Sequence, residues 1–229
     1  IEQSIAREAL RLSFVQHKEF AVSLKGIQQE RTISDTFDQT MSGETLVDMN
    51  KLDMIVGSGG VLSHAPRREQ AYRMLVDAFL PEGITQIAVD SIFMMPQLGV
   101  LSEIHEKAAV EVFNNDCLVR LGTCISPTQV DADNKEVMEY CFEYDDKKIE
   151  GILQFGEIKM IKIGFKLIKT KLIMKNNSKI NGLDEFSGNV YGGEVGIMLD
   201  GRGRPLDFDL FGKTFINNWS KQTNEYPQK

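Results

Sequence analysis

Apolar residues recur with a helical period at three places in the first half of the chain. In residues 1–20, 67–80 and about 96–115 they fall at spacings of three and four, the pattern of helices with one buried face. The side chains expected on the buried side of the third helix are Leu98, Leu101, Ile104, Ala108 and Val112. The pattern therefore predicts three amphipathic helices before residue 116.

Short apolar runs between these helices predict buried strands. Residues 54–56 are uniformly apolar, and residues 84–89 are mainly apolar with Thr85 and Gln86 among them, which favours buried parallel strands. A third, short strand is expected at 117–121, ended by the glycine and proline of 122–127. Strands that alternate with helices indicate an α/β layer with parallel strands. Residues 21–50 are mixed in character, and we expect a loop or hairpin there.

The pattern changes after Pro127. Short apolar runs then alternate with turn residues to about Phe208, which is typical of a β-rich domain. We therefore expect an α/β unit at 1–127, a small β-rich domain at 128–213 and a flexible tail at 214–229.

A lysine-rich segment lies inside the expected β-rich domain. Nine lysines stand against two glutamates between Lys147 and Lys179. Four of them recur at spacings of three and four, which fits one face of a basic helix that binds an acidic partner or a membrane surface; they are Lys159, Lys162, Lys166 and Lys169. Gly164 and the many isoleucines favour strands with solvated lysines instead, and we expect strands.

Composition excludes several classes of protein. A formal net charge of −7 over 229 residues argues against a general nucleic-acid binder, and no apolar run reaches the ~18 residues of a membrane span. There is no signal-peptide pattern, so a cytoplasmic protein is expected, and Ile1 in place of Met suggests a piece of a longer chain. The three cysteines lack C-x-x-C spacing and are expected to be reduced structural thiols. His17, His64 and His105 have no metal-ligand spacing, so no metal site is expected.

Two groups of residues are candidates for a functional site. Gly57-Ser58-Gly59-Gly60 follows the first predicted strand and precedes a helix, as in turns that bring backbone N–H groups to a phosphate or ribose. The Rossmann pattern G-x-G-x-x-G is incomplete because its third glycine is missing, so spacing alone leaves a bare structural turn equally open. Asp200, Arg202 and Arg204 surround two glycines, which favours turn chemistry or a contact surface.

Longer strings around these residues resemble a known family. Residues 56–66 and 93–101, the second with Pro96-Gln97-Leu98-Gly99, resemble the adenosine motif and the helix start that close the second lobe in the actin, Hsp70 and sugar-kinase superfamily. Residues 192–206, with G-G-E-V-G and D-x-R-G-R-P, are similar to the end of the MutL accessory proteins of glutamate mutase, which are unrelated to the mismatch-repair protein of that name. Gln154-Phe155-Gly156-Glu157 is a weaker match. The resemblance covers about residues 5–209.

This resemblance implies both a fold and a function. The fold would be the C-terminal half of an actin-like (ribonuclease H-like) ATPase lobe followed by a small β-rich domain. The protein would be the C-terminal part of an ATP-dependent, chaperone-like reactivating factor for an adenosylcobalamin-dependent aminoacid mutase of the glutamate or ornithine type, with cobalamin held by the partner enzyme. The residues implied in nucleotide binding are Gly57, Ser58, Gly59, Gly60 and His64. Those implied in contact with the mutase or with a missing N-terminal lobe are Asp200, Arg202 and Arg204.

The sequence departs from the superfamily pattern in one respect. The D-x-G-x-T phosphate motif and the acidic residues for Mg²⁺ have no counterpart, and phosphoryl transfer needs both. ATP or ADP with Mg²⁺ would therefore be shared with the missing lobe, no catalytic residue is assigned, and the chain alone is not expected to hydrolyse ATP. Two alternatives remain open: a non-catalytic protein-interaction module, and the C-terminal lobe of a sugar or acyl kinase.

Overall fold

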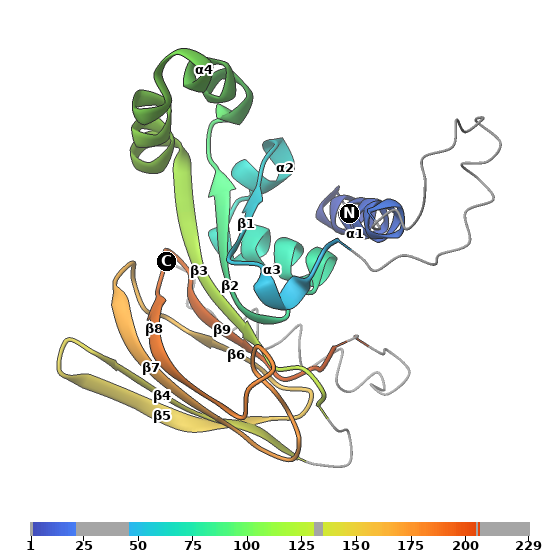
Figure 1. Cartoon of the computed structure of the whole chain (residues 1–229), viewed down its shortest axis with the longest axis vertical. Coiled ribbons are helices and arrows are strands. Elements are labelled where there is room, and N and C mark those ends of the chain that lie inside the picture. Colours follow the sequence, from blue (N-terminus) through green and yellow to red (C-terminus); the bar gives the residue numbers. More distant parts are fainter. Residues whose placement is uncertain (1, 22–45, 131–134, 205, 207–229) are drawn as a thin grey trace, which may run out of the picture.

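The described residues form two β-sheets. The computed structural model describes residues 2–21, 46–130, 135–204 and 206. Within them, one sheet has the strand order β1-β2-β3-β9-β6 and the other the order β5-β4-β7-β8 (Figure 1). One hydrophobic core lies between the first sheet and helix α3, and a second core lies between the two sheets. The first sheet is thus the middle layer of the fold.

The first half of the chain supplies the helices on the outer face of this sheet. Its elements are α1 (Glu2–Phe20), the 3₁₀ turn η2 (Met49–Lys51), β1 (Met54–Gly57), α2 (Gly60–Ser63), α3 (Arg68–Phe79) and β2 (Gly83–Asp90). The two predicted helices and two predicted strands of this region are confirmed. β1 and β2 pair in parallel, as predicted. The expected loop or hairpin at 21–50 falls mainly outside the described residues.

The second half adds one long helix and the remaining strands. Its elements are α4 (Met95–Val112), the π-helical turn η3 (Phe113–Cys117), β3 (Leu118–Ser126), β4 (Glu136–Tyr144), β5 (Lys147–Gln154), β6 (Ile158–Ile161), β7 (Leu167–Met174), β8 (Glu185–Tyr191) and β9 (Gly196–Asp200). The lysine-rich segment is built of strands and their connections, as expected. In the described part of the chain, no helix is both long and apolar enough to cross a membrane. The predicted tail at 214–229 lies outside the described residues.

Strand β3 differs from the prediction in length and direction. It continues through Gly122 to Ser126 and pairs antiparallel with β2, whereas a short parallel strand ending before Gly122 was expected. Gly122 allows the strand to continue because it has a φ of 150° and lies against the carbonyl of Gly196 on β9. A side chain at this position would separate the two strands. The glycine is therefore a point of close approach between strands rather than a strand end.

Strand β9 joins this sheet from far along the chain. It pairs in parallel with β3 and antiparallel with β6. Met198 packs in the core beside α3, while Ile197 and Leu199 pack in the core between the sheets. All five residues of β9 are buried because both faces of the sheet are covered. The first sheet therefore takes strands from both sides of residue 127, and the expected boundary there does not separate the sheets.

Helix α4 does not bury the face that its sequence predicts. Leu98 is 7% exposed, but Leu101, Ile104 and Val112 are 38%, 87% and 37% exposed. The helix is kinked at His105, which has non-helical φ and ψ of −148° and 76°, and the ring Nδ1 of His105 accepts a hydrogen bond from the backbone N–H of Ala108. The kink divides the predicted apolar stripe. α4 stands away from both sheets (Figure 1).

The two parts of α4 build a small core of their own. Leu98 packs with Ala109 and Cys117. We expect Ile104→Ser to change the free energy of unfolding by no more than about 0.5 kcal/mol, and Leu98→Ala to lower it by about 2 kcal/mol. Urea titration followed by circular dichroism measures both. A larger loss for Ile104→Ser than for Leu98→Ala would contradict the observed burial.

Candidate functional site

The glycine turn connects β1 to α2 at the end of the first sheet where the parallel strands β1 and β2 finish. Gly57 is buried, and a Cβ atom there would lie 2.8 Å from Leu62 Cδ1 and 2.9 Å from Leu75 Cδ2. Gly59 has a φ of 101°, a conformation that L side chains rarely adopt. The turn is therefore glycine-rich for two local reasons: the strand lies close to its helices, and the chain reverses within two residues.

The outer side of the turn is open. A Cβ atom built on Gly59 or Gly60 would meet no atom within 4 Å. Ser58, Gly59 and Gly60 line a groove of about 290 Å³, whose opposite wall is the α1 face that carries Ala6, Ala9, Leu10 and Ser13. Three of the predicted nucleotide-binding residues thus share one wall of this groove. It has space for a flat or extended ligand group to approach the backbone.

The other two predicted nucleotide-binding residues lie outside this groove. Gly57 is enclosed beneath the turn. His64 ends α2, and its Nδ1 lies 3.1 Å from the Ser63 hydroxyl. The structure thus brings Ser58, Gly59 and Gly60 together, with Gly57 beneath them and His64 at the far end of α2.

Asp90 is a residue at this edge that the sequence reasoning did not single out. Its buried carboxylate accepts hydrogen bonds from the backbone N–H groups of Ile92 and Met95, at 3.3 and 3.1 Å. Ser58 Oγ lies 3.5 Å from Asp90 Oδ2. Asp90 thereby fixes the start of α4 beside the glycine turn. The sequence did contain a signal for Asp90. It is the first charged residue at the end of a mainly apolar predicted strand, and that strand follows the one that leads into the glycine turn.

The second predicted group lies in the interior. The Asp200 side chain is fully buried, and Arg202 and Arg204 side chains are each 2% exposed. Arg202 binds Asp200 in a bidentate manner, with Nε–Oδ1 and Nη2–Oδ2 distances of 2.8 and 2.7 Å. Arg204 donates to Asp200 Oδ2 at 2.8 Å and to the Ser126 hydroxyl at 3.1 Å. These side chains form a buried ion network and present no exposed contact surface.

The network extends to α3 through Asp77. Arg202 Nη1 donates to Asp77 Oδ1 at 2.9 Å, and Arg73 Nε donates to Asp77 Oδ2 at 2.8 Å. Burial alone would raise the pKa of Asp200, but the guanidinium groups of Arg202 and Arg204 hold it well below its usual range. The pKa of Asp77 is lowered in the same way by Arg202 and Arg73, against the effect of burial. Both carboxyl groups are therefore permanently charged at neutral pH.

Asp77 was missed at the sequence level because it lies on a helix with a clear apolar stripe. The spacing of four residues between Arg73 and Asp77 was the visible signal of an ion pair. Its link to Arg202 joins residues 125 positions apart, which a local pattern does not reveal.

Two of the three cysteines, Cys117 and Cys124, are buried. All three are free thiols, and burial raises the pKa of the Cys124 thiol to about 12. A thiol with so high a pKa is not a nucleophile at neutral pH.

Comparison with known proteins gives one match. The model of a family described as MutL protein matches residues 1–117. No curated protein and no solved structure matches the chain. The matched region contains α1, the glycine turn, Asp77 and the whole of α4.

Proposed function

Because the chain belongs to the MutL protein family, which is associated with glutamate mutase, we propose that it is part of an ATP-dependent accessory protein of an adenosylcobalamin-dependent aminoacid mutase. Its role would be to bind the adenosine side of ATP or ADP. The observation that carries the proposal is the open glycine turn between the buried parallel strand β1 and helix α2. In open α/β sheets, ligands bind at the carboxyl edge of the strands.

Ser58, Gly59 and Gly60 are the residues proposed to contact the nucleotide. They lie at this edge, and the space above Gly59 and Gly60 is empty, so a ligand can reach the backbone. The apolar face of α1 on the other side of the groove offers a surface for a purine or ribose. The sequence contains no D-x-G-x-T motif. The phosphates and Mg²⁺ would therefore be completed by a second lobe, and this chain alone would not hydrolyse ATP.

A protein-interaction module is the second candidate, and helix α4 favours it. Val100, Leu101 and Ile104 expose 71%, 38% and 87% of their surface on an element that stands away from both sheets (Figure 1). Exposed apolar groups that gather on one element are typical of contact surfaces. In this reading the glycine turn is structural and α4 binds the mutase. No feature of the described residues favours the sugar- or acyl-kinase alternative.

Nucleotide binding is tested by Gly60→Val. The new side chain enters open space at a residue without a left-handed φ, so we expect the fold to be retained and the groove to be obstructed. ADP binding, measured by isothermal titration calorimetry, should weaken at least tenfold, equivalent to about 1.4 kcal/mol.

Gly164→Val is the matched control, because Gly164 also has open space around its Cα and no left-handed φ. It should bind ADP like the unaltered chain. Equal ADP binding by all three proteins would remove the turn from the site. No ADP binding by the unaltered chain would leave the interaction module as the better reading.

A further inference from the structure

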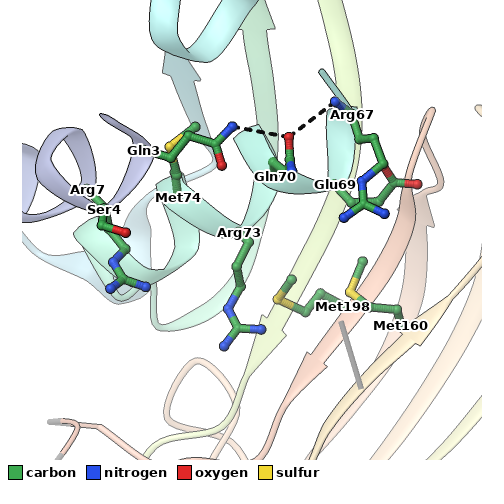
Figure 2. Close-up of a pocket in the computed structure, with 10 residues that line it drawn as sticks. All are labelled: Gln3, Ser4, Arg7, Arg67, Glu69, Gln70, Arg73, Met74, Met160 and Met198. Carbon is green, nitrogen blue, oxygen red and sulfur yellow. Dashed lines mark hydrogen bonds between the residues drawn. The ribbon is translucent and has the colours of Figure 1, made fainter. Parts of the chain in front are cut away.

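A second pocket lies between α1, the N-terminal half of α3 and strands β6 and β9. Its volume is about 200 Å³, and Figure 2 shows the residues around it. No residue lines both this pocket and the groove at the glycine turn. The two spaces are therefore separate candidates for ligand binding.

The walls of the pocket are basic. Arg7 reaches it from α1, and Arg67 and Arg73 reach it from the beginning and the middle of α3, while Glu69 is the one acidic side chain among the lining residues. In the described part of the chain, Arg67 forms no ion pair within 4 Å. Arg7 contributes an Nη1 atom 3.4 Å from Asp77 Oδ2, an oxygen that it shares with Arg73.

Arg73 carries a hydrogen-bond donor that is buried and has no partner. Its Nε atom binds Asp77, but Nη1 has no hydrogen-bond acceptor among the described residues. Figure 2 shows the guanidinium group extending from α3 toward the space beside Met198. An unsatisfied buried donor costs roughly 1–3 kcal/mol. Such a group calls for a specific explanation.

The ion network behind the pocket has an excess of positive charge. Asp77 and Asp200 are its carboxylates, and its guanidinium groups belong to Arg7, Arg73, Arg202 and Arg204. The two carboxylates balance only half of this charge. Arg202 and Arg204 use their donors on Asp77, Asp200, Ser126 and backbone carbonyls. Arg7 and Arg73 are the members of the network that line the pocket, and Arg73 contributes the buried donor.

The floor of the pocket is apolar. Met74, Met160 and Met198 line it, and methionine adapts its shape to irregular apolar groups. Polar groups that converge above an apolar surface are typical of small-molecule sites, and arginine forks bind carboxylates and phosphates.

We propose that this pocket binds a small molecule through an oxyanion, a carboxylate or phosphate group, that accepts a hydrogen bond from Arg73 Nη1 and is flanked by Arg7 and Arg67. The anion supplies the negative charge that the network lacks. A short apolar part of the ligand rests on the three methionines. The proposal does not rest on nucleotide binding at the glycine turn.

Thermal unfolding at constant ionic strength tests the proposal, with sodium chloride replaced stepwise by sodium phosphate or sodium butyrate. We expect at least one of the two anions to raise Tm of the unaltered chain saturably, by roughly 2–4 °C. A preference for butyrate would assign a carboxylate ligand with an apolar tail, and a preference for phosphate would assign a phosphate ester. The absence of a saturable rise with either anion would overturn the proposal.

Arg73→Met and Arg67→Met should each weaken the response to the anion at least tenfold in the midpoint concentration. Arg67→Met keeps the test valid if Arg73→Met does not fold, because Arg67 has no ion pair to lose in the described structure. Arg11→Met is the matched control, since Arg11 is on α1 but binds Glu8 of the same helix; it should respond normally. Gly60→Val should also respond normally, which separates this site from the glycine turn. Equal responses by Arg73→Met and Arg11→Met would contradict the assignment.

Discussion

Asp200→Asn is expected to lower the free energy of unfolding by about 3–5 kcal/mol, because it leaves a buried guanidinium group without its principal carboxylate. Asp200 accepts a bidentate pair from Arg202 and a third bond from Arg204. Water cannot replace the carboxylate, since the side chain is fully buried. Urea titration at pH 7 followed by circular dichroism measures the loss.

The pH dependence of the free energy of unfolding tests the same prediction independently. A free aspartate has a pKa of about 3.9, and Asp77 and Asp200 have lower values in the folded protein. Their stabilising effect is therefore present in full above about pH 4 and is lost as the pH falls toward the folded-state values. The slope of stability against pH in this acid range should be shallower in Asp200→Asn than in the unaltered chain.

Two variants control for the change of residue type. Asp184→Asn removes a carboxylate that is 80% exposed and pairs with Lys179, and it should cost no more than about 1 kcal/mol. Asp200→Asn combined with Arg202→Met should lose less than Asp200→Asn alone, because it removes the buried charge together with its partner. A loss of less than 1 kcal/mol for Asp200→Asn would show that the network does not hold these layers together.

Gly122→Ala is expected to have a similarly large effect, a loss of more than about 4 kcal/mol or failure to fold. The added Cβ atom would lie 1.7 Å from the carbonyl oxygen of Gly196 and 2.7 Å from its carbon. Both neighbours are backbone atoms of β9, so the collision cannot be relieved by a change of rotamer. Far-ultraviolet circular dichroism and thermal unfolding measure the outcome.

Gly99→Ala is the matched control for this substitution. Gly99 lies in α4, and a Cβ atom there meets nothing within 4 Å. Alanine is the better helix former, so Gly99→Ala should be neutral or stabilising by up to about 1 kcal/mol. Similar losses of stability in Gly122→Ala and Gly99→Ala would mean that the close approach of β3 and β9 does not exclude a side chain at residue 122.

The local parts of the fold were predictable from the sequence, and the reasons are physical. The helical stripe of α3 and the apolar runs of β1 and β2 each record which face of one element is buried, and the stripe of α1 records the face that packs partly buried on α3. The glycine turn was predictable for the same reason, because its residues act on their immediate neighbours. The placement of Ser58, Gly59 and Gly60 in one open groove follows from that turn.

The remaining features depend on contacts between distant segments. The pattern of residues 196–200 does not predict that this strand pairs with β3. The ion pair of Asp77 with Arg202 depends on that pairing, because it places Arg202 beside α3. The predicted face of α4 was wrong for a different reason: a continuous period assumes a straight helix, and His105 interrupts it. Arg202 and Arg204 both bind Asp200, but the burial of these three side chains was not predictable from a glycine-rich string that resembles a surface turn.

The position of β9 has a consequence for how the protein is made. A ribosome that has completed residue 117, the end of the family match, has synthesised only β1 and β2 of the first sheet. β3 can pair with β2 at once, but its second partner, β9, is synthesised about 70 residues later, and until then the other edge of β3 is unpaired. Long-range parallel pairing of this kind is slow and prone to aggregation. The unpaired edge of β3 therefore makes the interval between the synthesis of β3 and that of β9 a stage at which the first sheet is open to wrong pairing.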